Sequence, residues 1–87
     1  MIPTVIKSYD KEGDIRIGWA SWDKGTYTKR SIKYAYLDKN GKISRGSPEV
    51  SFDALIEMVI FAYQQGEFSK EEVEKLKKIF CHKEEME

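Results

Sequence analysis

The chain has little of what catalytic and metal sites are built from. Among its 87 residues there is one cysteine, Cys81, and one histidine, His82. A single thiol cannot close an intrachain disulfide, which is typical of proteins of the reducing cytoplasm. A structural zinc site needs about four ligands, usually Cys and His side chains. Cys81 and His82 cannot form a catalytic Cys–His pair either, because neighbouring residues of a helix point about 100° apart. We therefore expect no metal, no cofactor and no enzymatic activity.

Long apolar runs are missing as well. The longest one, residues 58–63, is far shorter than the ~20 residues that span a bilayer. Residues 1–4 lack the basic and then apolar plan of a signal peptide. The six glycines are scattered and form no phosphate-binding loop. These absences lead us to expect a soluble, cytoplasmic protein with no membrane partner.

What the chain does have is a first half patterned for β-strands. Residues 2–8 form a first candidate strand, residues 15–22 a second and residues 26–37 the longest one. Gly25 marks a turn between the second and third candidates. Because side chains alternate along a strand, Ile15, Ile17 and Trp19 are expected on one face of the second candidate strand and Arg16 and Trp22 on the other. On the third, Ile32, Tyr34 and Tyr36 share one face, and Tyr27, Lys29 and Lys33 share the other. If the two strands are antiparallel neighbours, the basic residues of both can lie on the same side of the sheet.

The strongest local signal is the tetrapeptide Asp-Lys-Asn-Gly at residues 38–41. Asn-Gly favours a two-residue type I′ hairpin turn, because both residues tolerate a positive φ. A type I turn followed by a bulge at Gly41 is the near alternative. Either turn returns the chain as a short fourth strand over residues 42–45.

The second half is patterned for two helices. Ser51 can cap a helix over residues 52–65, and Gly66 is placed to end it. This helix is apolar on nearly all sides, so the sheet, the last helix or a second subunit must cover more than one of them. Ser69 and Glu72 form a capping box for a second helix that runs to about residue 81.

These elements predict an α+β fold, an antiparallel sheet of three or four strands followed by two C-terminal helices packed on one face. Residues 1–82 are expected to form a single domain, and residues 83–87 a frayed acidic tail. The expected core consists of Ile15, Ile17, Trp19, Ile32, Tyr34, Tyr36, Leu55, Val59, Phe61, Phe68, Val73, Leu76 and Phe80.

The zero net charge hides an uneven distribution. Residues 16–45 carry a net charge of +6, and the rest of the chain carries −6. Aromatic residues are interleaved with these basic ones, a combination that suits single-stranded nucleic acid, whose phosphates meet cations and whose bases stack on rings. The candidate contacts are Arg16, Trp22, Lys24, Tyr27, Lys29, Arg30, Lys33, Lys42 and Arg45.

A family resemblance points the same way. Residues 31–46 read Ser-Ile-Lys-Tyr-Ala-Tyr-Leu-Asp-Lys-Asn-Gly-Lys-Ile-Ser-Arg-Gly, and residues 50–55 read Val-Ser-Phe-Asp-Ala-Leu. This order of basic strand, acidic-Gly turn, Arg-Gly and helix start resembles the positive-cofactor-four-like transcriptional coactivators and their bacterial relatives. The resemblance implies an intracellular homodimer that binds single-stranded DNA on a curved sheet, with Lys33, Lys42 and Arg45 in contact with the DNA.

Two other interpretations stay open. The solvated face of an antiparallel sheet often carries Lys, Thr and Tyr simply because they suit strands and keep edges soluble. The same strands would also serve a protein-interaction module or a small inhibitor of phage or virus type, through a sheet edge or an exposed aromatic patch. A homodimer through the helix at residues 52–63 is compatible with either function.

Overall fold

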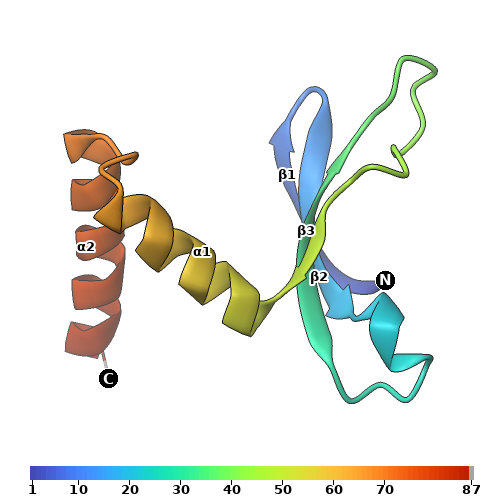
Figure 1. The fold of residues 1–87 in the computed structure, drawn as a ribbon, viewed down its shortest axis with the longest axis horizontal. Coiled ribbons are helices and arrows are strands. Elements are labelled where there is room, and N and C mark those ends of the chain that lie inside the picture. The colour runs from blue at the N-terminus through green and yellow to red at the C-terminus, as the bar shows by residue number, and fades with distance from the viewer. Residues whose placement is uncertain (87) are drawn as a thin grey trace. The chain divides into compact units, whose positions relative to one another are not determined.

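The computed structural model describes the backbone of residues 1–86 and the side chains of residues 1–81. The elements, labelled in Figure 1, are β1 (Ile2–Asp10), β2 (Gly13–Trp19), the 3₁₀ turn η1 (Ser21–Asp23), β3 (Arg30–Tyr36), β4 (Glu49–Ser51), α1 (Phe52–Gln64) and α2 (Lys70–Met86). They fall into two units, Met1–Ile56, which we call the sheet unit, and Glu57–Glu87, which we call the helical unit. The prediction of one domain over residues 1–82 stays a prediction.

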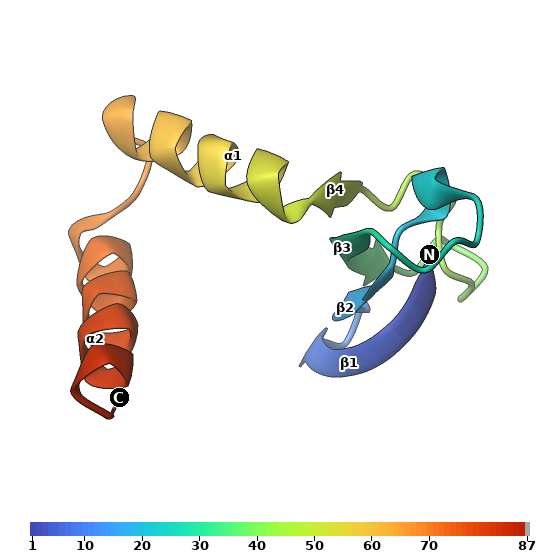
Figure 2. The same ribbon diagram turned by 90° about the horizontal axis from the view of Figure 1, so that it is seen from below.

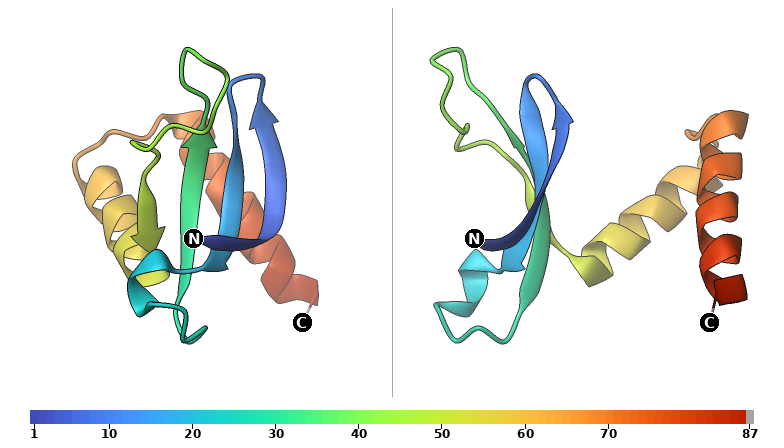
Figure 3. Two further views of the ribbon diagram at one scale, coloured as in Figure 1. Left: turned by 90° about the vertical axis from the view of Figure 1, so that its right-hand side faces the viewer. Right: turned by 180° about the vertical axis from the view of Figure 1, so that it is seen from behind.

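The sheet unit is an antiparallel sheet of four strands in the order β1-β2-β3-β4, which Figure 3 shows side by side. Together with the two helices that follow, this confirms the α+β class. The register pairs Ile17 with Ile32 and Arg16 with Lys33, which places the predicted apolar residues of the two strands on one face. The packing of both helices on one face of the sheet stays a prediction.

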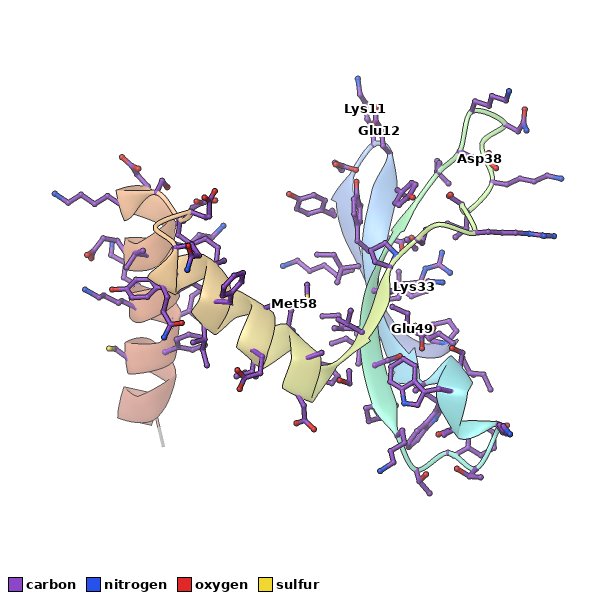
Figure 4. All side chains as sticks on the ribbon, viewed as in Figure 1. Lys11, Glu12, Lys33, Asp38, Glu49 and Met58 are labelled. Atoms are coloured by element: carbon purple, nitrogen blue, oxygen red, sulfur yellow. The ribbon has the colours of Figure 1, made fainter. Side chains whose placement is uncertain are left out.

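The two faces of the sheet differ in chemistry. One face, which we call the aromatic face, carries Ile15, Ile17, Trp19, Arg30, Ile32, Tyr34 and Tyr36. The opposite, polar face carries Asp14, Arg16, Gly18, Ser31, Lys33, Ala35 and Glu49. Figure 4 shows Lys33 and Glu49 projecting to the same side.

The prediction of the core is wrong, because none of the predicted core residues is fully buried. Within the part of the chain that the structure describes, the buried apolar side chains are Ala20 and Ala35, and Ser31 is also fully buried. The residues that the sequence analysis placed in the core are half-buried or exposed. The buried Ser31 and Ala35 lie on the polar face of the sheet, opposite the face on which its core residues were predicted.

Gly18 allows the start of β1 to come close to β2. A Cβ atom at this position would meet the backbone oxygen of Ile2 and would lie 2.6 Å from the Cα atom of Pro3. The pairing of β1 with β2 shifts register between Pro3 and Val5 and again between Ser8 and Asp10. Such irregularities bend a strand and increase its twist, and β1 is visibly curved in Figure 2.

The segment before β3 is a loop, although residues 26–37 were predicted as one strand and residues 15–22 as another. Tyr27 has a φ of 56°, which no strand residue adopts. Trp22 lies in η1, after the end of β2. Trp22, Tyr27 and Lys29 therefore do not alternate along strands, and their predicted place on a sheet face is wrong.

The fourth strand is also displaced from its predicted position. Residues 42–45 contribute a single bridge, Leu37 to Ile43, and β4 instead pairs Glu49–Ser51 with the first half of β3. The edge of β3 beyond this pairing is occupied by a turn. The Tyr36 oxygen accepts a hydrogen bond from the Ser44 N–H at 2.8 Å, and the Tyr36 N–H donates to the Ser47 hydroxyl at 3.2 Å.

The Asn-Gly turn takes the second of its two predicted forms. Gly41 donates its N–H to the Asp38 oxygen at 3.0 Å and has a φ of 78°, while Asn40 has no positive φ. This is a type I turn followed by a glycine bulge. The Asp38 carboxylate accepts further hydrogen bonds from the N–H groups of Asn40 and Lys42, at 2.8 and 3.0 Å.

The helix ends follow the sequence signals. The Ser51 hydroxyl accepts from the Ala54 N–H at 3.1 Å. Ser69 and Glu72 exchange the two hydrogen bonds of a capping box, at 2.8 and 3.1 Å. α1 ends in a Schellman motif, in which Gly66 and Glu67 donate to the oxygens of Tyr63 and Ala62. α2 runs to Met86, past its predicted end, and Glu87 of the predicted frayed tail lies outside the described residues.

Candidate nucleic-acid interface

The nine predicted contact residues lie at three places in the sheet unit. Five of them are in or next to the loop at residues 20–30, namely Trp22, Lys24, Tyr27, Lys29 and Arg30. Arg16 and Lys33 are neighbours in the middle of the sheet. Lys42 and Arg45 are in the hairpin that follows β3, at the opposite end of that strand from Lys29 (Figure 1). One continuous surface of all nine is therefore not formed.

The central pair is partly neutralised. The Arg16 guanidinium donates to the Asp14 carboxylate at 2.7 Å, and this hydrogen bond lowers the pKa of Asp14 and raises that of Arg16. Lys33 pairs in register with both Arg16 and Glu49. Carboxylates next to both cations make this part of the polar face a weak attractor for phosphate.

Asp23 fixes the loop at residues 20–30. Its carboxylate accepts hydrogen bonds from the backbone N–H groups of Gly25, Thr28 and Lys29, at 3.0, 3.1 and 3.0 Å. The bond from Lys29 has the largest effect of those that lower the pKa of Asp23. Lys24 and Gly25 take positive φ values of 54° and 81° to close the turn. The loop is thus a defined structure, although it lacks regular secondary structure.

Arg30 is held against Trp19. Its guanidinium carbon lies 4.6 Å from the centre of the Trp19 ring, a cation–π geometry. The same guanidinium donates to the Thr4 hydroxyl at 2.7 Å. The Tyr27 ring also meets Trp19 edge-on, with ring centres 5.9 Å apart. Arg30 therefore has a structural role in addition to its charge.

A groove of about 240 Å³, which we call the Trp22 groove, is lined by residues of this loop together with the end of β4 and the start of α1. Two of its lining residues present exposed rings, since Trp22 is 46% and Phe52 is 37% exposed. Lys29, Arg30 and Asp53 are the charged residues of the lining. The full lining is Trp22, Thr28, Lys29, Arg30, Ser51, Phe52 and Asp53.

Glu49 anchors η1, which carries Trp22, to the sheet. Its carboxylate accepts from the Ser21 N–H at 2.9 Å, from the Ser21 hydroxyl at 3.1 Å and from the Ser31 hydroxyl at 2.8 Å. The amino group of Met1 lies 3.7 Å away. Burial alone would raise the pKa of Glu49, but the hydrogen bonds from Ser21 and Ser31 outweigh it, so the pKa lies below its ordinary value.

Sequence reasoning missed Phe52 and Glu49 as parts of this site. The sequence analysis assigned Phe52 only to the apolar helix. Its position directly after the capping residue Ser51 was the one signal that its ring lies at the start of that helix and can reach the groove. Glu49 carries no such signal, because its partners Ser21 and Ser31 are far from it in the chain.

No group of acidic, His or Cys side chains that could hold a metal ion occurs among the described residues, and the side chain of His82 lies outside them. Neither helix, over the range that the structure describes, is long and apolar enough to cross a membrane. Comparison of the chain with family models, with curated proteins and with solved structures finds no match. The resemblance to the positive-cofactor-four-like coactivators stays a prediction.

Proposed function

We propose that this protein binds single-stranded nucleic acid, without catalysis, at the Trp22 groove. The observation that carries the proposal is that two exposed rings, Trp22 and Phe52, line one groove together with Lys29 and Arg30. A base stacked on an aromatic ring contributes ~1–3 kcal/mol whatever its identity. Cations beside the rings meet the phosphates that connect stacked bases.

The roles of the residues follow from their contacts. Trp22 and Phe52 are the stacking platforms, and Lys29 is the principal phosphate contact. Arg30 supports the site, because its guanidinium is shared between Thr4 and Trp19. Asp53 repels phosphate, so the backbone of the nucleic acid passes on the Lys29 side of the groove.

The fixed loop supports binding. Ordering a flexible loop at an interface costs about 0.5–1.5 kcal/mol for each immobilised side chain. The Asp23 carboxylate already orders the backbone that carries Lys29. Lys24 and Tyr27 lie in the same loop outside the groove lining, and Tyr27 is 54% exposed, so we expect only a longer strand of nucleic acid to contact them.

The other predicted contacts take a secondary place in this proposal. Arg16 is engaged by Asp14, and Lys33 faces Glu49. Lys42 and Arg45 lie at the far end of β3, so only a longer strand of nucleic acid reaches them. We expect their substitution to change affinity less than substitution of Lys29.

The test is a fluorescence anisotropy titration with mixed-sequence single-stranded DNA and RNA at several salt concentrations. Trp22→Ala should weaken binding ~5- to 150-fold, the loss of one stacked base. Lys29→Glu should weaken binding and lower the slope of log affinity against log salt by about 0.7, the loss of one phosphate contact.

The matched control is Lys11→Glu, which makes the same charge change at the β1–β2 turn, away from the groove (Figure 4). It should retain near-normal affinity. Absence of binding at low salt, or an equal loss in Lys11→Glu and Lys29→Glu, would overturn the proposal.

A protein-interaction module is the second candidate, and the exposed side chains of β1 favour it. Val5 and Tyr9 are 58% and 63% exposed, and the Tyr9 ring meets Tyr34 on the aromatic face. Pro3 and the two register shifts make the edge of β1 a poor template for strand addition, so such a partner would bind the aromatic patch. The ratio of absorbance at 260 and 280 nm of freshly purified protein separates the two candidates.

A further inference from the structure

The loop at residues 20–30 also lines a second pocket, of about 220 Å³, which we call the Tyr27 pocket. Its aromatic members are Trp19 and Tyr27, whose rings meet edge-on with centres 5.9 Å apart. Tyr27 is 54% exposed, and Trp19 is half-buried. Pockets that take drug-sized ligands measure about 300–1,000 Å³, so a pocket of this size suits one smaller, flat group.

Tyr27 lines this pocket from an unfavourable backbone conformation. Its φ of 56° lies in the left-handed region, which glycine adopts readily and which is rare for a bulky side chain. The Asp23 carboxylate imposes this conformation, because it binds the N–H groups of Thr28 and Lys29 directly after Tyr27. Strained residues of this kind concentrate at ligand sites. A ring that stays more than half exposed gains little from burial in return, which indicates that it serves a ligand.

The polar side chains of the lining are already engaged. The Ser21 hydroxyl donates to the Glu49 carboxylate at 3.1 Å. The Asp23 carboxylate accepts three hydrogen bonds from the backbone of its own loop. Neither group is free to read the hydrogen-bonding edge of a ligand. The pocket offers an exposed ring instead, and stacking on a ring accepts any nucleic-acid base.

The loop contributes to the Trp22 groove and to the Tyr27 pocket in turn. Trp22 lines the groove, and its neighbour Asp23 lines the pocket. Tyr27 lines the pocket, and its neighbour Thr28 lines the groove. Lys24 lines neither, is exposed and lies between the two sets along the chain. Two ring sites with a cation between them match the alternation of bases and phosphates along a single strand.

We propose that the Tyr27 pocket takes a second base of the strand that binds at the Trp22 groove, with a phosphate between the two bases at Lys24. This inference rests on the function proposed above. It gives the protein two stacking sites, of which the second is indifferent to the identity of the base. A thymidine decanucleotide, within the ~4–16 nucleotides that one single-strand-binding fold covers, is long enough to test both.

The two tryptophans of the chain report on the two sites separately, because Trp22 lines the groove and Trp19 lines the pocket. Each indole N–H gives one signal in a nitrogen-15 NMR spectrum, and Trp22→Phe assigns them. Saturation with the decanucleotide at low salt should shift both signals. A shift of the Trp22 signal alone would overturn the second base site and leave the proposed function intact. If neither signal shifts, the proposed function fails as well.

Tyr27→Gly is the second test, because glycine adopts the φ of this position without strain and the loop should keep its fold. Its melting temperature should not fall, whereas its affinity for the decanucleotide should fall ~5- to 150-fold, the loss of one stacked base. The Trp19 signal should then no longer shift, and the Trp22 signal should still do so. Tyr27→Phe keeps the ring and should bind like the native chain.

The matched control is Tyr9→Ala, which removes a ring of similar exposure, 63%, next to the β1–β2 turn. It should retain near-normal affinity. An unchanged affinity in Tyr27→Gly, or an equal loss in Tyr9→Ala, would overturn the proposal. A Trp19 shift that persists in Tyr27→Gly would do the same, because it would then come through Arg30, which contacts Trp19 and lines the groove.

The phosphate at Lys24 has its own test. Lys24→Gln should lower the slope of log affinity against log salt by about 0.7, the loss of one phosphate contact. An unchanged slope would overturn this placement of the phosphate.

Discussion

Replacement of Glu49 by glutamine is expected to destabilise the sheet unit by about 2 kcal/mol. The carboxylate is only 14% exposed and accepts three hydrogen bonds from Ser21 and Ser31, whose hydroxyl is fully buried. A hydrogen bond to a charged group contributes ~1.5–3 kcal/mol and a neutral one ~0.5–1.5 kcal/mol. The Ser21 N–H and the Ser31 hydroxyl share one carboxylate oxygen, and each bond loses about 1 kcal/mol of charge assistance. The Ser21 hydroxyl can rotate to accept a hydrogen bond from the new amide, so the total is ~2 kcal/mol.

Urea denaturation followed by tryptophan fluorescence measures this change. Trp19 and Trp22 are the two tryptophans of the chain, and both lie in the sheet unit, so the signal reports on that unit. The control is Glu12→Gln, the same chemical change at an exposed carboxylate of the β1–β2 turn. If Glu49→Gln lies within ~0.5 kcal/mol of this control at pH 7, Glu49 is not the anchor that its contacts indicate.

The cost of Glu49→Gln should also depend on pH. The pKa of Glu49 lies below its ordinary value of 4.5 in the folded chain. Its ionised form therefore contributes stability that is fully present above pH 4.5 and is lost as the pH falls through the lowered pKa of the folded state. The free-energy difference between native and variant chains should shrink in that acidic range. A difference that is the same at pH 7 and pH 3 would refute the explanation.

Two further predictions concern the sheet unit. Gly18→Ala should cost about 1–3 kcal/mol, the usual cost of overpacking, because the new methyl group meets the backbone of Ile2 and Pro3; an unchanged urea midpoint would contradict the close approach of β1. Asp23→Ala should lower the melting temperature and reduce the near-ultraviolet circular dichroism of Trp19, because the loop that holds Tyr27 against it loses three hydrogen bonds. A native spectrum would show that other contacts hold the loop.

Local signals predicted the parts of the fold that depend on local contacts. The capping box of Ser69 and Glu72 and the helix end at Gly66 involve hydrogen bonds between residues a few positions apart. The glycine bulge at Gly41 was one of two predicted forms, and the carboxylate of Asp38 favours it by holding the N–H groups of Asn40 and Lys42.

Hydrogen bonds from the side chains of Asp23 and Glu49 decided what the strand patterns did not predict. Residues 26–29 alternate like a strand, yet the carboxylate of Asp23 binds their backbone and ends the pattern at Arg30. Residues 42–45 have a strand-like sequence, but β3 pairs with Glu49–Ser51, where Glu49 also finds Ser21 and Ser31. Hydrophobic periodicity contains no information about such partners.

Part of the candidate site could likewise be predicted from the sequence, and part could not. The basic and aromatic composition of residues 16–45 identified Trp22, Lys29 and Arg30, which line one groove. It did not distinguish them from Lys42 and Arg45, because composition does not tell at which end of the sheet a residue lies. The ring of Phe52 joins the groove only through the pairing of β4, which places the start of α1 beside the loop.

The turn after β3 also affects the chemical degradation of the protein during storage. Asparagine followed by glycine deamidates readily, since the glycine nitrogen can attack the side-chain carbonyl and close a succinimide ring. In Asn40-Gly41 the Gly41 N–H donates a hydrogen bond to the Asp38 backbone oxygen at 3.0 Å. Attack of this nitrogen on the Asn40 side chain therefore requires the turn to open first. The rate at which aspartate and isoaspartate accumulate at position 40 during storage therefore measures how often this hairpin opens locally.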